Sequence, residues 1–319
     1  MLSVIIPAFN EETTVRLAAE TIGALLAGEQ IGYELVFVDD GSRDATWEKI
    51  CDACAADQNV RGLHFSRNFG KEAAMFAGLE NARGDCCAVM DCDLQHPPET
   101  LVEMYRLWEQ GYEVVEGVKD DRGKESGLHA LAAGSFYKLV SWAAQFNMRN
   151  SSDFKLLDRK VVDAINAMPE RHVFFRALSY WVGFKRAEVH YNVRERVAGE
   201  SKWSTRSLIR YAVHNIASFS SAPMQLVTWV GVIFCVFAVV LGIQTLVRLI
   251  MGLSLEGFTT VILLILLSSG LIMLSLGIIG FYFARMYDEI KGRPRYIISE
   301  KRGGISSSAV PDGQGDGRA

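Results

Sequence analysis

Short apolar runs alternate with amphipathic stretches over residues 1–120. Apolar runs that predict strands lie at 2–7, 33–40, 60–66, 86–91 and 112–118. The stretches between them predict helices at 11–27, 45–56, 71–82 and 98–110, with Asp44 as the N-cap of the second. Strands that alternate with helices are typical of a mostly parallel sheet covered by helices on both faces. The pattern therefore predicts an α/β domain.

Two later stretches are apolar enough to cross a membrane. Residues 226–247 form a run of 22 residues without a charge, and residues 258–284 form a run of 27. A helix needs about 20 residues to span the roughly 30 Å hydrocarbon core of a bilayer. Because both runs reach this length and only a short connection separates them, the sequence predicts a transmembrane hairpin.

Basic residues flank this hairpin but are rare in its connection, which contains only Arg248. Before the first span and after the second lie Arg194, Arg196, Lys202, Arg206, Arg210, Arg285, Lys291, Arg293, Arg295, Lys301 and Arg302. Lys and Arg are enriched in cytoplasmic segments next to spans. We therefore expect an integral plasma-membrane protein whose N-terminal domain and both termini are cytoplasmic.

These features divide the chain into four parts. We expect a cytoplasmic domain over 1–203, an amphipathic interfacial segment over 204–223, the hairpin over 224–287 and a cytoplasmic tail over 288–319. Apolar residues at near-helical spacing and two arginines suit a helix that lies at the headgroup level. An ordinary helix packed on the domain is the alternative. The Gly- and Ser-rich end of the tail is expected to be disordered, and no signal peptide is expected.

Charge and cysteine usage narrow the class of protein. The formal net charge of -4 gives no support for nucleic-acid binding. Cys51 and Cys54 form a C-x-x-C pattern inside a predicted helix, without a second pair or a histidine cluster. Buried thiols in a reducing cytosol are therefore favoured over a zinc or redox site.

Acidic and polar clusters follow three of the predicted strands, in "PAFNEE", "VDDGSRD" and "DCDLQ". In parallel sheets the carboxyl ends of the strands share one edge, where ligands bind. The D-x-D spacing places Asp91 and Asp93 on the same side of an extended backbone. Two close carboxylates repel each other unless a cation lies between them, and Mg²⁺ takes such ligands together with substrate phosphates. A solvated acidic turn is the alternative for a D-x-D motif that stands alone.

The motifs "VIIPAFNEE", "VDDGSRD", "RNFGKEAA" and "DCDLQHPPE" at these spacings resemble those of family 2 glycosyltransferases, which have the Rossmann-like GT-A fold. With the two C-terminal spans, the chain is similar more narrowly to polyisoprenyl-phosphate glycosyltransferases, which include dolichol-phosphate mannose synthases and bactoprenol glucosyltransferases. The resemblance covers about residues 2–290. One departure is Cys92, where alanine is usual, and this side chain is expected to point away from the metal.

The resemblance implies a donor-nucleotide site at the strand ends. Pro7, Phe9 and Glu11 match the first nucleotide-binding loop, with Glu11 expected on the ribose. Asp39 matches the acid near the base. Asp91 and Asp93 match the motif that binds the metal, Mg²⁺ or Mn²⁺, and the diphosphate, and Gln95 is their companion.

The resemblance also implies catalytic and acceptor residues. Asp153 in "SSDFKLLDR" matches the proposed catalytic aspartate, and Asp93 is the second residue expected to be catalytic. Asp153 could act as a base, orient a neighbour, or only end a strand or cap a helix. The segment "RERVAGESKW" matches a basic motif near the acceptor phosphate. The expected acceptor ligands are Arg122, Arg196, Ser201 and Lys202.

Roles for the other basic residues stay open. Arg122 and Lys124 belong to a loop that solvent alone could explain. Arg67 and Lys71 are interpreted as structural residues that fix the loop after the third strand.

The activity implied is transfer of a monosaccharide from a nucleotide-diphosphate sugar to polyprenyl phosphate, with UDP-glucose favoured over UDP-N-acetylglucosamine or GDP-mannose. A processive polysaccharide synthase of the same superfamily is disfavoured because the sequence has no Q-x-x-R-W motif. A catalytically silent membrane scaffold is disfavoured by the intact Asp91, Asp93, Asp153, Arg196 and Lys202. The sequence leaves homo-oligomers open.

The asymmetry of basic residues generates a prediction about topology. A cysteine introduced as Ser254→Cys, in the connection between the spans, should react with a membrane-impermeant thiol reagent added to intact cells. The unmodified protein, with its six native cysteines, is the control. Labelling of the variant only after permeabilisation would reverse the predicted orientation.

Overall fold

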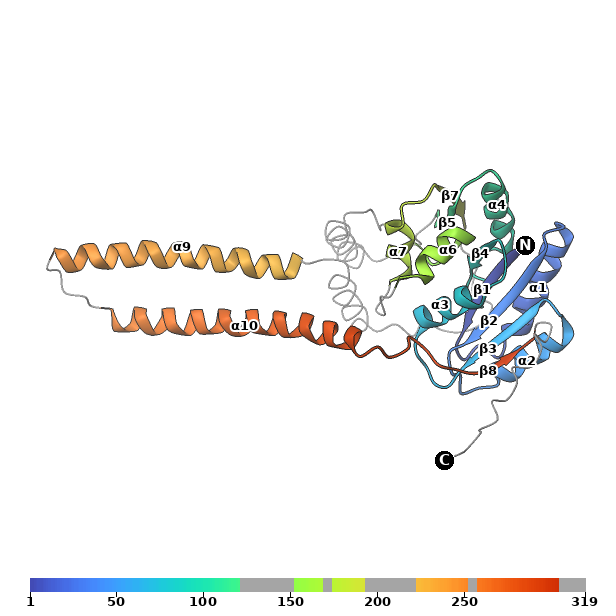
Figure 1. Cartoon of the computed structure of the whole chain (residues 1–319), viewed down its shortest axis with the longest axis horizontal. Coiled ribbons are helices and arrows are strands. Elements are labelled where there is room, and N and C mark those ends of the chain that lie inside the picture. Colours follow the sequence, from blue (N-terminus) through green and yellow to red (C-terminus); the bar gives the residue numbers. More distant parts are fainter. Residues whose placement is uncertain (121–151, 169–173, 193–221, 252–256, 304–319) are drawn as a thin grey trace, which may run out of the picture.

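The structure is a computed structural model, and it describes residues 1–120, 152–168, 174–192, 222–251 and 257–303. A domain built around a β-sheet makes up one end of the molecule, and two long helices extend from it (Figure 1). The sheet determines where the predicted site residues lie, and the two helices contain the predicted membrane spans.

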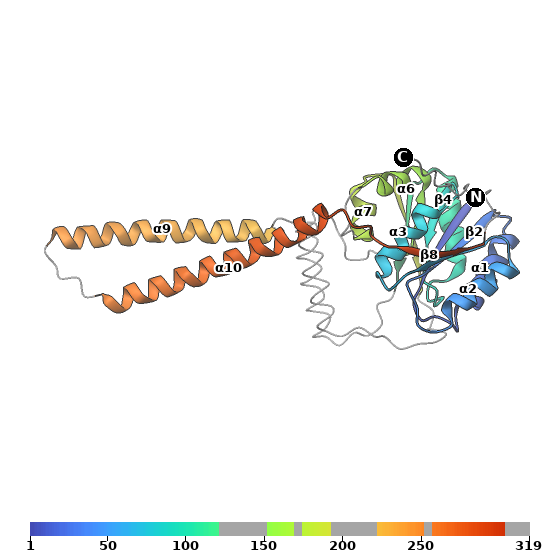
Figure 2. The ribbon, with the colours of Figure 1, turned by 60° about the horizontal axis from the view of Figure 1, so that its bottom comes forward.

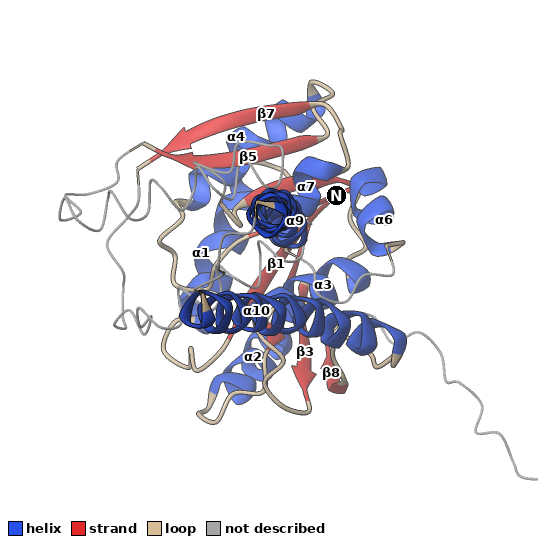
Figure 3. Cartoon of the chain, turned by 90° about the vertical axis from the view of Figure 1, so that its left-hand side faces the viewer, coloured by secondary structure: helices blue, strands red, loops and turns tan. Residues whose placement is uncertain are grey.

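Eight strands in the described residues form a single sheet in the order β7-β5-β6-β4-β1-β2-β3-β8. Seen along the long helices, β7 and β5 lie at one end of this sheet and β3 and β8 at the other (Figure 3). The strands are β1 (Leu2–Ala8), β2 (Tyr33–Asp39), β3 (Val60–Phe65), β4 (Cys86–Val89), β5 (Val114–Lys119), β6 (Lys155–Asp158), β7 (Arg186–Tyr191) and β8 (Ile298–Arg302).

Helices pack on both faces of the sheet. One face carries α1 (Val15–Gly28), α2 (Thr46–Ala56) and α4 (Pro98–Glu109). The other carries α3 (Lys71–Asn81), α6 (Arg159–Asn166) and α7 (Phe175–Trp181). Side chains of a strand point alternately to its two faces, so the strands contribute to two separate cores. The predicted α/β fold with helices on both faces is confirmed.

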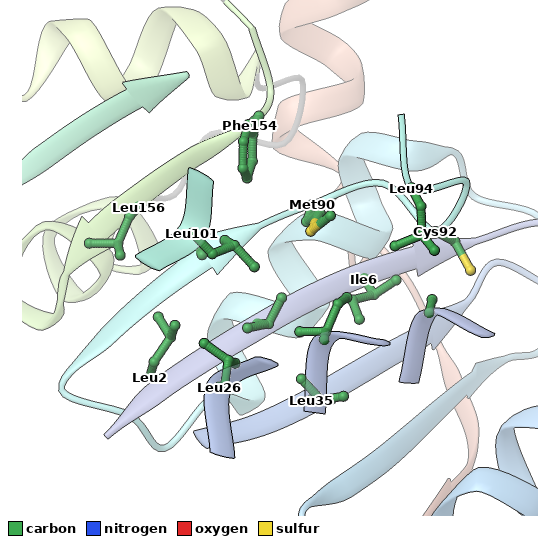
Figure 4. Packing of buried hydrophobic residues seen from close by; sticks show 14 of the residues in the cluster. Leu2, Ile6, Leu26, Leu35, Met90, Cys92, Leu94, Leu101, Phe154 and Leu156 are labelled. Carbon is green, nitrogen blue, oxygen red and sulfur yellow. The ribbon is translucent and has the colours of Figure 1, made fainter. Parts of the chain in front are cut away.

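Strand β1 illustrates this division. Leu2 and Ile6 belong to the core beneath α1 and α4, together with Leu26 and Leu101 (Figure 4). Ile5 faces the opposite core, beneath α3. Because both faces of β1 are buried, its sequence is an unbroken apolar run, as expected for a central parallel strand.

The first helix begins later than its sequence pattern predicts. The prediction started it at residue 11, but α1 begins at Val15. Asn10 has a φ of 55°, and the N–H groups of Asn10, Glu11 and Glu12 donate to side chains of the 42–46 loop. These hydrogen bonds hold residues 10–12 as a loop, so the prediction of a helix there was wrong.

Three strands, β6, β7 and β8, were absent from the sequence prediction. β6 lies antiparallel between β4 and β5, whereas β4, β1, β2 and β3 are parallel to one another, and β5 is parallel to β7. Because β6 is antiparallel to both of its neighbours, β5 and β7 run in the same direction as β4. The carboxyl ends of β7, β5, β4, β1, β2 and β3 therefore share one edge of the sheet.

The two long helices are α9 (Ala222–Ile250) and α10 (Phe258–Ile290). Both are long and apolar enough to cross a membrane, over Val227–Arg248 and Leu267–Ile290, and none of either window is buried within the protein. The predicted spans, 226–247 and 258–284, fall within these helices. The predicted interfacial segment, 204–223, lies outside the described residues except for its last two, which begin α9.

After α10 the chain returns to the sheet domain (Figure 2). β8 pairs antiparallel with the edge strand β3. The connection to β8 is held by Arg295, which donates from Nη2 to the Met168 carbonyl at 2.7 Å, and by Tyr296, whose ring stacks on Phe65 with centroids 5.1 Å apart. The residues that follow the second long helix are therefore part of the domain that precedes the first.

Close packing of α3 on β1 generates a stability prediction. A Cβ at Gly78 would lie 2.1 Å from Ile5 Cγ2, whereas a Cβ at Gly28 in α1 would have nothing within 4 Å. Gly78→Ala should lower the free energy of unfolding by about 1–3 kcal/mol, because a packed core tolerates added volume poorly. Gly28→Ala, the control, should be neutral or stabilising by less than about 1 kcal/mol. Thermal unfolding of the detergent-solubilised variants checks this, and equal effects would contradict the packing argument.

Candidate active site at the carboxyl edge of the sheet

The predicted donor-site residues lie at the carboxyl ends of three adjacent strands. β1 and β2 pair up to Ala8 and Asp39, whereas the pairing of β1 with β4 ends at Ile5 and Val89. Pro7 thus lies beyond the end of β4, where its missing N–H leaves no ladder hydrogen bond unmade. Phe9 follows with 43% of its surface exposed, so its ring lies open at this edge.

The loops after β1 and β2 are bound to each other. The N–H of Asn10 donates to Ser42 Oγ at 2.9 Å, and the N–H of Glu11 donates to Thr46 Oγ1 at 2.8 Å. The Glu11 carboxylate accepts a hydrogen bond from Thr14 Oγ1 at 2.8 Å. Glu11 is thereby fixed beside the second loop, in a place that a nucleotide at the β1–β2 boundary would reach.

Asp39 ends β2 and is completely buried. Its Oδ1 accepts from the N–H of Ser42 at 3.0 Å, and its Oδ2 lies 2.7 Å from His64 Nδ1. His64 in turn stacks on Trp47 with ring centroids 4.9 Å apart. In this structure Asp39 therefore holds the loop after β2 in place from a buried position.

Asp40 binds the loop that precedes α3. Its Oδ1 accepts the N–H of Phe69 at 2.6 Å, and its Oδ2 accepts the N–H of Gly70 at 2.9 Å. Burial raises the pKa of Asp40, although these two donors oppose the effect. Gly41 adopts a φ of 65°, and a Cβ there would lie 2.4 Å from the Arg67 carbonyl carbon. The loop after β2 and the loop before α3 are thus in backbone contact, and this contact fixes the start of α3.

The segment after β4 separates polar from apolar side chains. It is a turn, with Leu94 at a φ of 55°, and is not the extended strand that the sequence predicted up to residue 91. Cys92, Leu94 and His96 are nonetheless buried, whereas Asp91 and Asp93 are partly exposed. Figure 4 shows Cys92 and Leu94 in the core beside the strands. Cys92 faces the protein interior, as expected for a residue that does not bind metal.

Lys71, the first residue of α3, joins two of the predicted acids. Its Nζ lies 2.6 Å from Asp91 Oδ1 and 3.2 Å from Asp153 Oδ2. Burial lowers the pKa of Lys71, but Asp91 and Asp153 outweigh it and the pKa is raised. Burial likewise raises the pKa of Asp91, but Lys71 outweighs it and the pKa is lowered. The interpretation of Lys71 as a purely structural residue was too narrow, since its ammonium is part of the site.

Asp153 is held by a second cation, Arg176 of α7. Arg176 Nε donates to Oδ1 at 2.6 Å and Nη2 donates to Oδ2 at 3.0 Å, so the contact is bidentate. Burial raises the pKa of Asp153, but Lys71 and Arg176 outweigh it and keep the pKa well below its ordinary value. Asp153 is therefore a stable carboxylate, which makes it a weak base and a strong orienting group.

A buried polar cluster fixes the backbone on either side of Asp153. Glu116 of β5 accepts from the N–H of Ser152 at 3.0 Å and from Lys155 Nζ at 2.8 Å, and it also binds Tyr180 and Arg186. Burial lowers the pKa of Lys155 to about 8 despite the glutamate. A charged residue inside each of two buried strands needs a partner, and this pair sets the register of β5 against β6.

Asp91 and Asp93 offer a donor set that suits a divalent cation. The described residues contain no group of three or more His, Cys, Asp or Glu side chains that could hold a metal. Mg²⁺ commonly uses one or two carboxylates and takes its other ligands from water and substrate phosphates. Lys71 pairs with Asp91 and Asp153, and Arg176 pairs with Asp153. The carboxylates of Asp91 and Asp93, in the turn after β4, are the residues that would hold such a cation.

The structure brings together part of the predicted site. Asp91 and Asp153 are joined through Lys71, and Asp93 and Gln95 share the turn with Asp91, where the Gln95 N–H donates to Asp93 Oδ1 at 3.1 Å. The predicted acceptor ligands Arg122, Arg196, Ser201 and Lys202 lie outside the described residues.

Sequence reasoning missed Arg176 and the Glu116–Lys155 pair. Arg176 is a lone basic residue in the apolar segment "FFRALSYW", which gives no indication of its partner. The lone charges in "VVEGV" and "FKLLD", in contrast, could have suggested a buried ion pair between two strands.

Comparison with known proteins places this chain in a family. Residues 3–166 match the model of the family described as glycosyl transferase family 2. The chain belongs to this family and is a glycosyltransferase.

Relatives extend the similarity beyond the family domain. The uncharacterized glycosyltransferase YkcC of Bacillus subtilis is 36% identical over 307 residues, which cover 94% of each chain. A prophage bactoprenol glucosyl transferase homolog of Escherichia coli is 36% identical over 93% of this chain and 98% of its own. An SfII prophage-derived bactoprenol glucosyl transferase of Shigella flexneri is 35% identical over 95% of this chain and 99% of its own.

Solved structures share the fold at lower identity. The crystal structure of a mycobacterial protein has a TM-score of 0.50 at 20% identity and covers 68% of this chain and 72% of its own. Glucosyl-3-phosphoglycerate synthase from Mycobacterium tuberculosis, solved with Mn²⁺, UDP-glucose and phosphoglyceric acid, has a TM-score of 0.47 at 18% identity and covers 68% and 77%. At such identities the likeness concerns the fold alone.

The bidentate contact generates a prediction for Arg176→Ala. This variant should unfold about 1–3 kcal/mol more easily at pH 7, because it removes charge-assisted hydrogen bonds from a carboxylate that stays ionised. The pKa of Asp153 is lowered in the folded protein, so the stabilisation is fully present above the unfolded value of about 4, decreases below that pH, and is lost as the pH falls through the lowered folded pKa. Urea unfolding at pH 7 and pH 3 measures both effects.

Arg16→Ala is the matched control. Arg16 pairs with Glu20 at 2.7 Å, but 81% of the arginine side chain is exposed. Ion pairs this exposed contribute little to stability, because solvent screens them. Two results would contradict the assigned role of the Asp153 contact. One is a loss of stability in Arg16→Ala as large as that in Arg176→Ala, and the other is a loss of stability in Arg176→Ala that does not depend on pH.

Proposed function

We propose that this glycosyltransferase transfers glucose from UDP-glucose to a polyprenyl phosphate in the membrane. The proposal rests above all on the similarity, over nearly the whole of both chains, to proteins named bactoprenol glucosyl transferase. The strand-end acids and the two apolar helices agree with it, because the reaction needs a nucleotide-sugar site and access to a lipid.

In the proposed reaction a phosphate oxygen of the lipid attacks C1 of the glucose. A new bond forms between C1 and this oxygen, the bond from C1 to the β-phosphate oxygen breaks, and UDP leaves with the bonding electrons. Attack from the face opposite the leaving group inverts the configuration at C1. A phosphate monoester is largely dianionic at pH 7, so it needs no residue to remove a proton.

Asp153 then serves as an orienting group in preference to a base. Its carboxylate is held by Lys71 and Arg176, and its lowered pKa makes proton uptake unfavourable. The two cations lie where negative charge from both substrates would meet. Held in place before the reaction, they can stabilise that charge without reorganisation.

Residues on the β4 side of the site would help to neutralise the charge on the departing diphosphate. Asp91 and Asp93 would hold a divalent cation, which supplies Lewis-acid stabilisation of the leaving diphosphate. Arg196 and Lys202, from the basic motif, would bind the lipid phosphate. Pro7, Phe9, Glu11 and Asp39 would form the nucleotide side, and Mg²⁺ and Mn²⁺ are alternatives for the metal.

The two long helices support the membrane placement. Strands of the sheet domain precede α9 in the chain, and the chain returns to this domain through β8 after α10. A hairpin that starts and ends at one domain keeps both of its ends on one side of a bilayer. The basic flanks favour the cytoplasm as that side.

The experiment that tests this function uses the purified full chain with undecaprenyl phosphate and, separately, UDP-glucose, UDP-N-acetylglucosamine and GDP-mannose. Formation of a glucosylated lipid together with UDP, dependent on the lipid phosphate, is the expected result. Preference for another donor would correct the sugar. Polymer formation, or turnover that does not depend on the lipid, would contradict the proposal.

The acids after β4 generate a prediction with an internal control. Asp91→Asn and Asp93→Asn should each reduce transfer by at least about 100-fold, as expected for loss of an electrostatic catalytic group. Thermal unfolding should change little in Asp93→Asn, because this side chain is partly exposed, and somewhat more in Asp91→Asn, which also weakens the ion pair with Lys71. Cys92→Ala, between the two acids but buried, should keep most of the activity. Near-normal transfer by either asparagine variant, or after exhaustive chelation, would refute the metal role.

A further inference from the structure

The phenol of Tyr191 is buried without a hydrogen-bond partner. Tyr191 is the last residue of β7 and is 4% exposed. Among the described residues, its Oη has no hydrogen-bond partner. The nearby Ser152 Oγ donates to the Gly117 carbonyl at 2.8 Å and accepts from the Phe154 N–H at 3.1 Å. A buried hydroxyl without a partner is costly, so such a group points to a ligand that supplies the missing bond.

The ring of Tyr191 packs against the segments that carry the candidate site. The carboxyl end of β7 lies on the edge of the sheet that also carries Asp91. The ring meets Phe154 and His96 edge to face, with centroids 5.5 Å and 5.6 Å apart. Phe154 directly follows Asp153, and His96 Nδ1 faces the backbone N–H of Asp91 at 3.5 Å. Tyr191 is thus wedged between the two segments that carry the site carboxylates.

The electrostatic surroundings of the phenol agree with this placement. Burial raises the pKa of Tyr191 and the charge of Asp91 raises it further, and the opposing effects of Arg176 and of the nearby Ser152 do not outweigh them. The phenol therefore keeps its proton at physiological pH and is available as a hydrogen-bond donor.

Building on the proposed function, we infer that Tyr191 donates a hydrogen bond to a hydroxyl of the hexose being transferred and so helps to select the sugar. A sugar hydroxyl can accept from the phenol and donate its own proton to a carboxylate. Asp91 and Asp153 are such acceptors on neighbouring segments. A phosphate oxygen could accept from the phenol but has no proton to donate to these carboxylates, so a sugar hydroxyl is the better partner.

The test compares wild-type protein with Tyr191→Phe in the full chain. Phenylalanine keeps the ring packing and removes only the donor, so kcat/KM for UDP-glucose should fall by about 3- to 10-fold. Binding of UDP, which has no sugar, should stay unchanged. The Tm without donor should be equal or higher, because the variant loses a buried group that lacks a partner. Tyr105→Phe on α4, where the ring packs on Trp108, is the matched control and should alter none of these quantities.

Deoxy analogues of UDP-glucose identify the hydroxyl. For one position, the analogue and Tyr191→Phe should give losses that do not add, because each removes the same hydrogen bond. Three results would each overturn the inference. The losses from the deoxy analogue and from Tyr191→Phe could add at every position, the KM for the acceptor could be the one quantity that changes, or the Tm could fall while the sugar preference stays the same. If wild-type protein transferred another sugar, the proposed function would fail, and the deoxy series of that sugar would still decide the role of Tyr191.

Discussion

The site depends on one cation placed between two acids. Lys71 Nζ contacts Asp91 after β4 and Asp153 before β6. Two carboxylates brought this close in a partly dry site would repel each other, so the ammonium allows the turn and the strand to approach. Arg176, which belongs to α7, neutralises the charge of Asp153. Four elements therefore meet through one chain of ion pairs, and the shape of the site is tied to its charge balance.

The place of Lys71 is itself determined by a loop that carries no catalytic group. Asp40 accepts the N–H groups of Phe69 and Gly70, and the close approach of Gly41 to Arg67 leaves no room for a side chain. α3 then packs on β1 through Gly78. Asp40 thus acts on the reaction centre indirectly, because it fixes the start of the helix whose first side chain is the bridging cation.

The sequence predicted the features that depend on local pattern. The alternation of apolar runs located β1 to β5 and the helices between them, and the strand-end acids located the site. The antiparallel insertion of β6 and the return of β8 depend on contacts between segments that are distant in the chain, so no local period reveals them. Arg176 and Tyr191 escaped for the same reason. A lone arginine in an apolar segment, or a tyrosine at the end of a strand, acquires meaning only from what the fold places opposite it.

The pairing of β8 with β3 also bears on how such an enzyme would meet a lipid. Under the proposed function, one substrate comes from water and the other is confined to a bilayer, so the reaction centre must stay at a fixed height above the membrane. A domain joined to its hairpin at one end could rotate about that connection. Here the residues that follow α10 are fastened to the edge of the sheet through β8, Tyr296 and Arg295. This attachment begins a few residues after α10 ends, and strand pairing therefore links the position of the sheet edge to the axis of the second helix.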